Sequence, residues 1–148
     1  MMLFVSRLAP ALAVLLAAIA LSSVAAAAPD PEGADFAGCS GPGRITCVVD
    51  GDTFWYQGRK IRIADINAPE VSHPGCAREA ALGAAATRRL TQLLNAGPFS
   101  LAIEGREIDR YGRALRVVLR RGASLGAQLE REGLAEHWRG RRGDWCAT

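Results

Sequence analysis

Two short runs near the middle of the chain bring together oxygen atoms suited to holding a hard metal ion. Asp50-Gly51-Asp52-Thr53 contributes carboxylates, and Asn67-Ala68-Pro69-Glu70 contributes an amide oxygen and a further carboxylate. Calcium takes its ligands from carboxylates, amide groups and backbone carbonyl oxygens. Asp52, Asn67 and the carbonyl of Ala68 are therefore candidate calcium ligands, although an Asp-Gly-Asp run taken alone is more typical of a hairpin turn.

Glu70 is the candidate general base of the same region. The preceding residue, Pro69, restricts the backbone and so helps to set the direction of the carboxylate. A carboxylate beside a metal ion and a phosphate can take a proton from an attacking water molecule. Viewed in isolation, Glu70 is equally typical of a surface residue in a loop.

Arg62 and Arg113 are candidates for binding a phosphate group. A planar guanidinium contacts two phosphate oxygens at once and stays charged, which suits the extra negative charge of a pentacoordinate transition state. Arg62 stands between two isoleucines in an alternating pattern that is just as typical of a surface arginine on a strand. Tyr111 and Arg110, shortly before Arg113, are candidates for nucleic-acid contact through base stacking and positive charge.

The first 27 residues have the pattern of a signal peptide. Arg7 precedes an apolar run over 8–21, and small residues follow up to Ala27, after which we expect cleavage. An uncleaved membrane anchor is the alternative, and it is disfavoured because about 20 apolar residues are needed to span a bilayer. Removal leaves about 120 residues, enough for one domain. We therefore expect a secreted or periplasmic protein without stable membrane association.

Arginines are concentrated in the last third of the chain, although the formal net charge of the 148 residues is only +3. Clustered arginine is typical of a surface that binds a polyanion. Because Lys60 is the single lysine, the cluster is also explained by a solvated face in a chain that uses arginine as its cation. The arginines in question are Arg110, Arg113, Arg116, Arg120, Arg121, Arg131, Arg139, Arg141 and Arg142.

Four cysteines, all after the predicted signal peptide, indicate two disulfides in an exported domain. Four cysteines allow three connectivities, of which we predict Cys39–Cys47 and Cys76–Cys146. A zinc site is the alternative, and it is disfavoured because the chain has no Cys-x-x-Cys pair and its two histidines lack ligand spacing.

The hydrophobic pattern predicts an α+β domain over 44–148, preceded by a linker over 28–43. A meander of three strands precedes a long helix, two further strands and a second helix that Ser124 can cap. Five strands with appended helices indicate a five-stranded OB-fold barrel, a frequent host of nucleic-acid sites. The predicted strands are 45–49, 53–56, 60–66, 99–103 and 114–119, and the predicted helices are 77–94 and 124–132.

Taken together, these motifs resemble the thermonuclease family, the staphylococcal-nuclease-like domains. The resemblance covers roughly 44–138, in the family's order and close to its spacing. The matching sequence motifs are Val49-Asp50-Gly51-Asp52-Thr53, Ile61-Arg62-Ile63, Ala68-Pro69-Glu70, Asp109-Arg110-Tyr111-Gly112-Arg113 and Glu132-Gly133-Leu134-Ala135.

The resemblance implies an OB-fold and calcium-dependent endonucleolytic cleavage of DNA and RNA that leaves a 3′-phosphate and a 5′-hydroxyl. We expect a monomer that prefers single strands. In the family pattern Asp52 falls on the first calcium carboxylate, Glu70 on the general base, and Tyr111 on a residue that contacts the bound nucleotide. Arg62 and Arg113 fall on the phosphate-binding arginines.

Two departures from the family pattern stand out. Asn67 occupies the position of a second calcium carboxylate, and the lost negative charge predicts weaker calcium binding. Asp65 is the candidate to compensate for that charge, although it precedes Asn67 by two residues and we expect it to point elsewhere. The chain also ends soon after Trp138, where fuller members continue into another helix. The alternatives are a catalytically weak or inactive nucleic-acid-binding OB-fold module, which Asn67 favours, and a protein-binding module, which no residue favours.

Overall fold

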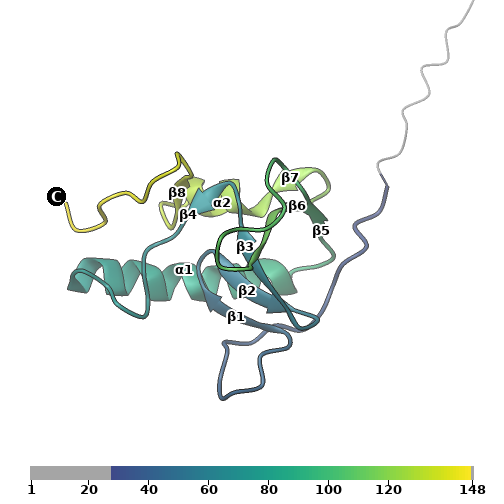
Figure 1. Cartoon of the computed structure of the whole chain (residues 1–148), viewed down its shortest axis with the longest axis horizontal. Coiled ribbons are helices and arrows are strands. Elements are labelled where there is room, and N and C mark those ends of the chain that lie inside the picture. Colours follow the sequence, from purple (N-terminus) through teal and green to yellow (C-terminus); the bar gives the residue numbers. More distant parts are fainter. Residues whose placement is uncertain (1–27, 148) are drawn as a thin grey trace, which may run out of the picture.

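The computed structural model describes residues 28–147 as an α+β domain in which one long helix lies along a twisted sheet (Figure 1). The signal peptide predicted over 1–27 lies outside the described residues. In the described part of the chain, no helix is long and apolar enough to cross a membrane.

The first three strands form the predicted antiparallel meander: β1 (Cys47–Asp50), β2 (Thr53–Tyr56) and β3 (Arg59–Ile63). Gly51 begins the β1–β2 turn, where a Cβ would lie 2.5 Å from the Cβ of Ala86 on the long helix. Only glycine allows the turn to approach the helix this closely. This close approach fixes the position of the carboxylates on either side of Gly51.

The rest of the main sheet comes from later in the chain. β6 (Ala114–Arg120) lies parallel to β3, and β5 (Ser100–Ala102) is antiparallel to β6, which gives the order β1-β2-β3-β6-β5. β7 (Ala123–Ser124) also pairs with β6. All five predicted strands are present. Within residues 28–147 the edge strands β1 and β5 do not pair with each other, so a closed barrel is not confirmed.

The strand predicted over 60–66 is wrong in its second half. The chain leaves β3 after Ile63 and forms a separate short strand, β4 (Ile66–Asn67), which pairs with β8 (Glu136–His137). The guanidinium of Arg62 donates to the carbonyl oxygens of Ile63 and Ile66 on either side of this break. The second ladder brings Asn67 opposite Glu136.

Two helices cover the sheet. α1 (Ala77–Asn95) is capped by the side chain of Cys76, and α2 (Leu125–Arg131) is capped by Ser124, whose hydroxyl accepts the N–H of Ala127 at 2.9 Å. The apolar face of α1 packs along β1 and buries Leu90, Leu93 and Leu94. α2 contacts β6 and α1 and closes the other side of the core.

Residues 30–39, in the predicted linker, are an integral part of the domain. Phe36 is only 5% exposed, and its ring lies about 6 Å from the rings of Phe54, Tyr56 and Phe99. The Asn95 side chain accepts the N–H of Phe36 at 2.7 Å and donates to its carbonyl oxygen at 2.9 Å. Part of the predicted linker therefore packs against the core of the domain.

The two disulfides are Cys39–Cys47 and Cys76–Cys146, as predicted. The first fastens the N-terminal segment to β1. The second joins residues 70 positions apart and ties the C-terminal tail to the start of α1. Long-range closure of this kind stabilises a small domain chiefly by restricting its unfolded chain.

Candidate active site

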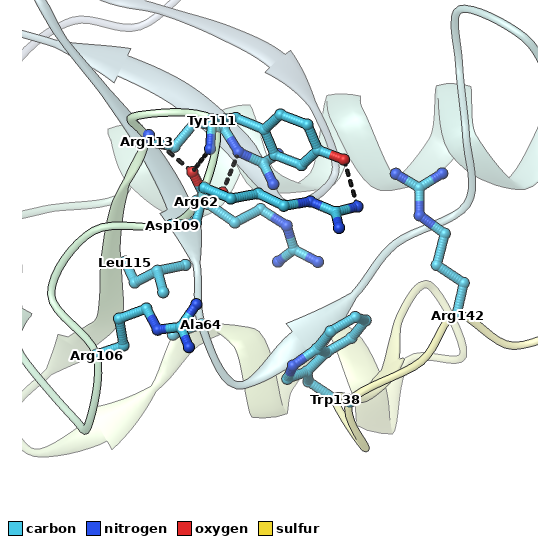
Figure 2. A pocket seen from close by; sticks show the side chains of 11 residues that line it. Arg62, Ala64, Arg106, Asp109, Tyr111, Arg113, Leu115, Trp138 and Arg142 are labelled. Atoms are coloured by element: carbon cyan, nitrogen blue, oxygen red, sulfur yellow. Dashed lines mark hydrogen bonds and ion pairs between the residues drawn. The ribbon is translucent and has the colours of Figure 1, made fainter.

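A cleft of about 610 Å³ opens between β3, the start of β6 and the C-terminal tail, and positively charged side chains dominate its wall. Figure 2 shows the labelled side chains around one open space. Five arginines line the cleft but only one acidic residue does, and this excess of positive charge suits a polyanion. The lining residues are Arg62, Ala64, Arg106, Asp109, Arg110, Tyr111, Arg113, Leu115, Trp138, Gly140 and Arg142.

Asp52 and Arg62 form a buried ion pair at the inner end of the site. Arg62 Nη2 lies 3.1 Å from Asp52 Oδ2, which also accepts the N–H of Ala68 at 2.7 Å. Asp52 Oδ1 accepts the Thr53 hydroxyl at 2.9 Å. The two runs singled out in the sequence are therefore joined through one carboxylate.

Arg62 is not the surface arginine that strand alternation allowed. It is 9% exposed, and its guanidinium is paired with the Asp52 carboxylate. Its guanidinium carbon lies 5.7 Å from the centre of the Trp138 ring. Burial lowers the pKa of Arg62, the charge of Asp52 opposes this, and the positive charges of Arg113 and Arg142 lower it further. Three guanidinium groups therefore act on one another across the cleft.

A turn organised by Asp109 holds Arg113 at the outer side of the cleft. Asp109 Oδ1 accepts the N–H groups of Tyr111 and Arg113, each at 2.9 Å, and Oδ2 accepts Arg113 Nε at 2.7 Å. Gly112 has a φ of 78°, which lets the chain reverse and enter β6. Because only Nε of Arg113 bonds to Asp109, its two terminal nitrogens stay free of this carboxylate.

Tyr111 and Arg110, the residues predicted to contact nucleic acid, lie on the same turn. Tyr111 is 68% exposed, and the guanidiniums of Arg110 and Arg113 lie 4.8 and 5.4 Å from the centre of its ring. Arg110 Nη2 also donates to the Tyr111 hydroxyl at 2.6 Å. An exposed aromatic ring between two cations offers both a stacking surface and charge.

Asp50 and Asp52 place two acids side by side beneath the Gly51 turn. Burial, followed by the charge of Asp52, raises the pKa of Asp50 to about 7. Arg62 pairs with Asp52 only. Repulsion between the two carboxylates disfavours the charged form of Asp50, and a bound cation would relieve it.

Asn67 is buried, and its side chain is held by a residue from another strand. Its Nδ2 donates to Glu136 Oε1 at 2.9 Å, across the β4–β8 ladder. With Nδ2 engaged, the amide oxygen of Asn67 is the atom left for another partner. Asp65 points toward the start of α2, where its Oδ2 accepts the Ser124 hydroxyl at 2.6 Å.

The oxygen atoms around Asp52 fit a hard cation better than a soft one. In residues 28–147 no three side chains among His, Cys, Asp and Glu are grouped to hold a metal ion. A calcium site would therefore combine the Asp52 carboxylate with the amide oxygen of Asn67 and the carbonyl of Ala68. Such a mixed oxygen set is within calcium's range.

Glu70 lies at the rim, where its carboxylate contacts an arginine. Glu70 Oε2 is 2.7 Å from Nη1 of Arg142, in the C-terminal tail. The backbone N–H of Glu70 donates to Glu79 Oε1 at 3.1 Å, which holds this loop against α1. The Glu70 side chain is 28% exposed and thus accessible from solvent.

The structure thus brings Asp52, Arg62, Arg113 and Tyr111 to one region, with Glu70 at its rim. The sequence did not indicate a role for Asp109, Glu136 or Arg142. Their side chains hydrogen-bond to those of Arg113, Asn67 and Glu70, respectively. The position of Arg142, four residues before Cys146, was the available signal, because the predicted disulfide carries this segment to the start of α1.

Comparison with known proteins agrees with this geometry. The model of the staphylococcal nuclease homologue family matches residues 60–144, more than half of the chain. Endonuclease YncB of Bacillus subtilis (strain 168) is 35% identical over 93 residues, which cover 60% of this chain. They cover 44% of YncB, so the chain spans less than half the length of that relative. The matched residues include Arg62, Glu70 and Arg113, and the chain belongs to the staphylococcal nuclease homologue family.

Proposed function

We propose that this protein is an exported, calcium-dependent endonuclease that hydrolyses phosphodiester bonds of DNA and RNA. The observation that carries the proposal is the arginine-lined cleft, which has Arg62 and Arg113 on its wall and Glu70 at its rim. Family membership and the named endonuclease relative support a nuclease of some kind. Metal, substrates and residue roles are our proposals.

In this mechanism the backbone phosphate enters the cleft between Arg62 and Arg113. Their guanidiniums hold its oxygens and stabilise the charge that builds up when a water oxygen attacks phosphorus. Glu70 takes a proton from that water. The bond to the 5′-oxygen breaks and this oxygen takes up a proton, which leaves a 3′-phosphate and a 5′-hydroxyl.

Asp52, Asn67 and the carbonyl of Ala68 would hold the calcium ion. When bound, it would supply positive charge that polarises the phosphate. Arg62 has a second task here, since its pairing with Asp52 fixes the direction of that carboxylate. The protein side of the site is therefore organised before substrate arrives.

The wider setting is also proposed. Two disulfides are typical of an oxidising compartment, which agrees with the predicted signal peptide and with a secreted or periplasmic location. We further propose that β1, β2, β3, β5 and β6 correspond to the five strands of an OB-fold barrel. A monomer with a preference for single strands completes the proposal, since exposed Tyr111 suits unpaired bases.

A nucleic-acid-binding module without catalytic activity is the second candidate. Two observations favour it: an uncharged amide stands at Asn67, and Arg142 occupies the Glu70 carboxylate. Such a module would retain the arginine cleft and would bind single strands without cutting them.

Digestion of denatured DNA and of RNA, with millimolar calcium and with chelator, distinguishes the two candidates. We expect calcium-dependent cleavage by the wild type and a loss of about 10²–10⁴-fold in Glu70→Gln. Glu104→Gln is the matched control, because Glu104 is exposed and lies outside the cleft lining. Binding without cleavage by the wild type would establish the module and reject the enzyme.

A further inference from the structure

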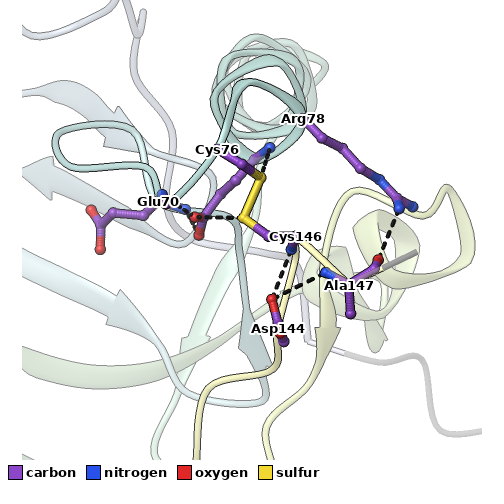
Figure 3. Close-up of a disulfide and its surroundings, with 8 residues drawn as sticks. Glu70, Cys76, Arg78, Asp144, Cys146 and Ala147 are labelled. Carbon is purple, nitrogen blue, oxygen red and sulfur yellow. Dashed lines mark hydrogen bonds between the residues drawn. A yellow bond between two sulfur atoms is a disulfide. The ribbon is translucent and has the colours of Figure 1, made fainter.

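The C-terminal tail after β8 reaches the cleft and is fastened at four points. Trp138 N–H donates to the carbonyl of Asp65 at 2.9 Å, and Gly143 N–H donates to Glu136 Oε1 at 2.5 Å. Cys146 is bonded to Cys76, and Arg78 Nη1 donates to the carbonyl of Ala147 at 3.0 Å. Figure 3 shows the last two anchors at the beginning of α1. The tail has no helix beyond β8, so these anchors determine its course.

Arg142 lies between the anchors and lines the cleft together with Arg62 and Arg113. Its side chain is 69% exposed, and an ion pair as exposed as Arg142–Glu70 contributes little to stability. Among residues 28–147 the hydrogen-bond partner of Arg142 is Glu70, through Nη1 alone. Nε and Nη2 therefore remain available to a ligand.

Arg62, by contrast, uses most of its hydrogen-bond donors for contacts within the protein. Nη1 donates to the carbonyls of Ile63 and Ile66, and Nη2 pairs with Asp52. Three of the five N–H donors of Arg62 are therefore engaged by the protein, against one of the five in Arg142, which leaves Arg62 fewer donors for phosphate oxygens. The cleft thus contains a less committed guanidinium in Arg142, next to Glu70.

We propose that Arg142 is a third phosphate-binding residue of this site, positioned by the Cys76–Cys146 disulfide. The proposal rests on the proposed function and concerns a polynucleotide phosphate. One edge of the guanidinium holds a phosphate oxygen while Nη1 retains Glu70, so that base and phosphate are placed together. The disulfide is required because the tail would otherwise depend on single hydrogen bonds and on the exposed pair itself.

Binding measured in chelator separates this role from cleavage. A fluorescein-labelled single-stranded 12-nucleotide DNA is titrated with the purified protein at several salt concentrations, and anisotropy is followed. Loss of one phosphate contact lowers the slope of log K against log salt by about 0.7 for single strands. We expect this change in Arg142→Ala, with about five-fold weaker binding, and recovery of the slope in Arg142→Lys.

Arg88→Ala is the matched control, since it removes the same charge from an exposed position on α1 away from the cleft. It should leave the slope unchanged. If the wild type binds DNA and Arg142→Ala behaves like Arg88→Ala, the inference is overturned and the proposed function stands. If the wild type neither binds nor cuts nucleic acid, both are overturned.

The disulfide is tested by repeating the Arg142→Ala comparison in Cys76→Ser/Cys146→Ser, after circular dichroism shows that this variant folds. We expect Arg142→Ala to cost less affinity there than in the disulfide-bonded protein. The same comparison on chemically reduced protein serves if the serine variant does not fold. An equal cost with and without the disulfide would overturn the positioning role.

Discussion

The two halves of the cleft are built in opposite ways. In the inner half, Arg62 is buried and hydrogen-bonded to a carboxylate and two backbone carbonyls. In the outer half, Tyr111 and Arg142 are more than two-thirds exposed and lie on a turn and a tail. The same residue type therefore meets two environments in one site.

This difference indicates what each half of the cleft contributes to folding, catalysis and binding. The guanidinium of Arg62 is buried and held by two carbonyls and a carboxylate, so the inner half offers a nearly fixed arrangement at the point where charge develops. Removal of such a group also leaves a buried charge unpaired. Exposed side chains adapt to a flexible polymer but add little to folding. Inner substitutions should thus affect folding and catalysis together, and outer ones should affect binding.

The largest effect is expected for Arg62→Gln. It leaves Asp52 buried without its ion-pair partner, which lowers the free energy of unfolding by about 3 kcal/mol. Catalysis should fall about 10³-fold because one guanidinium facing the phosphate is lost. Urea denaturation and initial rates measure the two effects. A loss of activity without a loss of stability would show that buried Arg62 does not contribute more to folding than the exposed residues of the outer half do.

Asp109→Asn should have the next largest effect, because it releases Arg113 while leaving the inner half intact. An asparagine Nδ2 would oppose Arg113 Nε–H as donor against donor, and we expect about ten-fold lower activity at pH 7. Asp109→Glu, which keeps the charge but lengthens the side chain, serves as the comparison.

Low pH should remove the contribution of ionised Asp109 to the stability of the fold. Burial raises the pKa of Asp109, but hydrogen bonds from Arg113 and Tyr111 outweigh burial and the net shift is downward. A carboxylate with a depressed pKa stabilises the fold above the unfolded value of 3.8, and this contribution is lost as pH falls through the folded pKa. The stability difference between wild type and Asp109→Asn should therefore shrink below about pH 4. A constant difference would contradict this assignment.

Calcium affinity should respond to Asn67 and Glu136 as a pair. In Asn67→Asp a carboxylate would face Glu136 Oε1, which now accepts from Asn67 Nδ2 at 2.9 Å. The gain from the added negative charge would then be partly cancelled by like-charge repulsion. In Asn67→Asp/Glu136→Gln the glutamine amide can donate to the new carboxylate. Calorimetric titration should give the tightest calcium binding in the double variant, by several-fold, and equal affinities would reject the site.

Tyr111→Ala should have the smallest effect. The ring is exposed, so stability should not change, while loss of base stacking should weaken single-strand binding by about 1 kcal/mol. Tyr111→Phe keeps the ring and should keep most of the affinity. A destabilised Tyr111→Ala variant would show that the outer half contributes to folding after all.

Local features were the most predictable from the sequence. Turn chemistry at Asp50-Gly51, helix capping by Ser124 and the meander all depend on neighbouring residues, and all are observed. The disulfide pairing was one of three possibilities and is also confirmed. The residues of the cleft could be named because several short motifs act together.

Long-range contacts were the part that the sequence did not predict. Alternation allowed an exposed Arg62 on β3, but its guanidinium is buried against Asp52 and lies near Trp138 of the C-terminal tail. Composition suggested a linker over 28–43, because Pro, Gly and Asp outnumber the single aromatic ring of Phe36 that anchors it. Arg142 acquires its position through contacts between distant residues, among them Gly143 with Glu136 and Cys146 with Cys76.

The N-terminal segment has a consequence for self-association. Ala37 and Cys39 hydrogen-bond with Val48 on β1, and Glu32 pairs with Phe99 just before β5. One stretch of chain therefore covers strand backbone at both edges of the main sheet. Unpaired strand backbone is a template on which other chains add. A protein lacking residues 28–38 would expose this backbone together with the aromatic rings beneath Phe36. It would be expected to aggregate even where its arginine cleft remained intact.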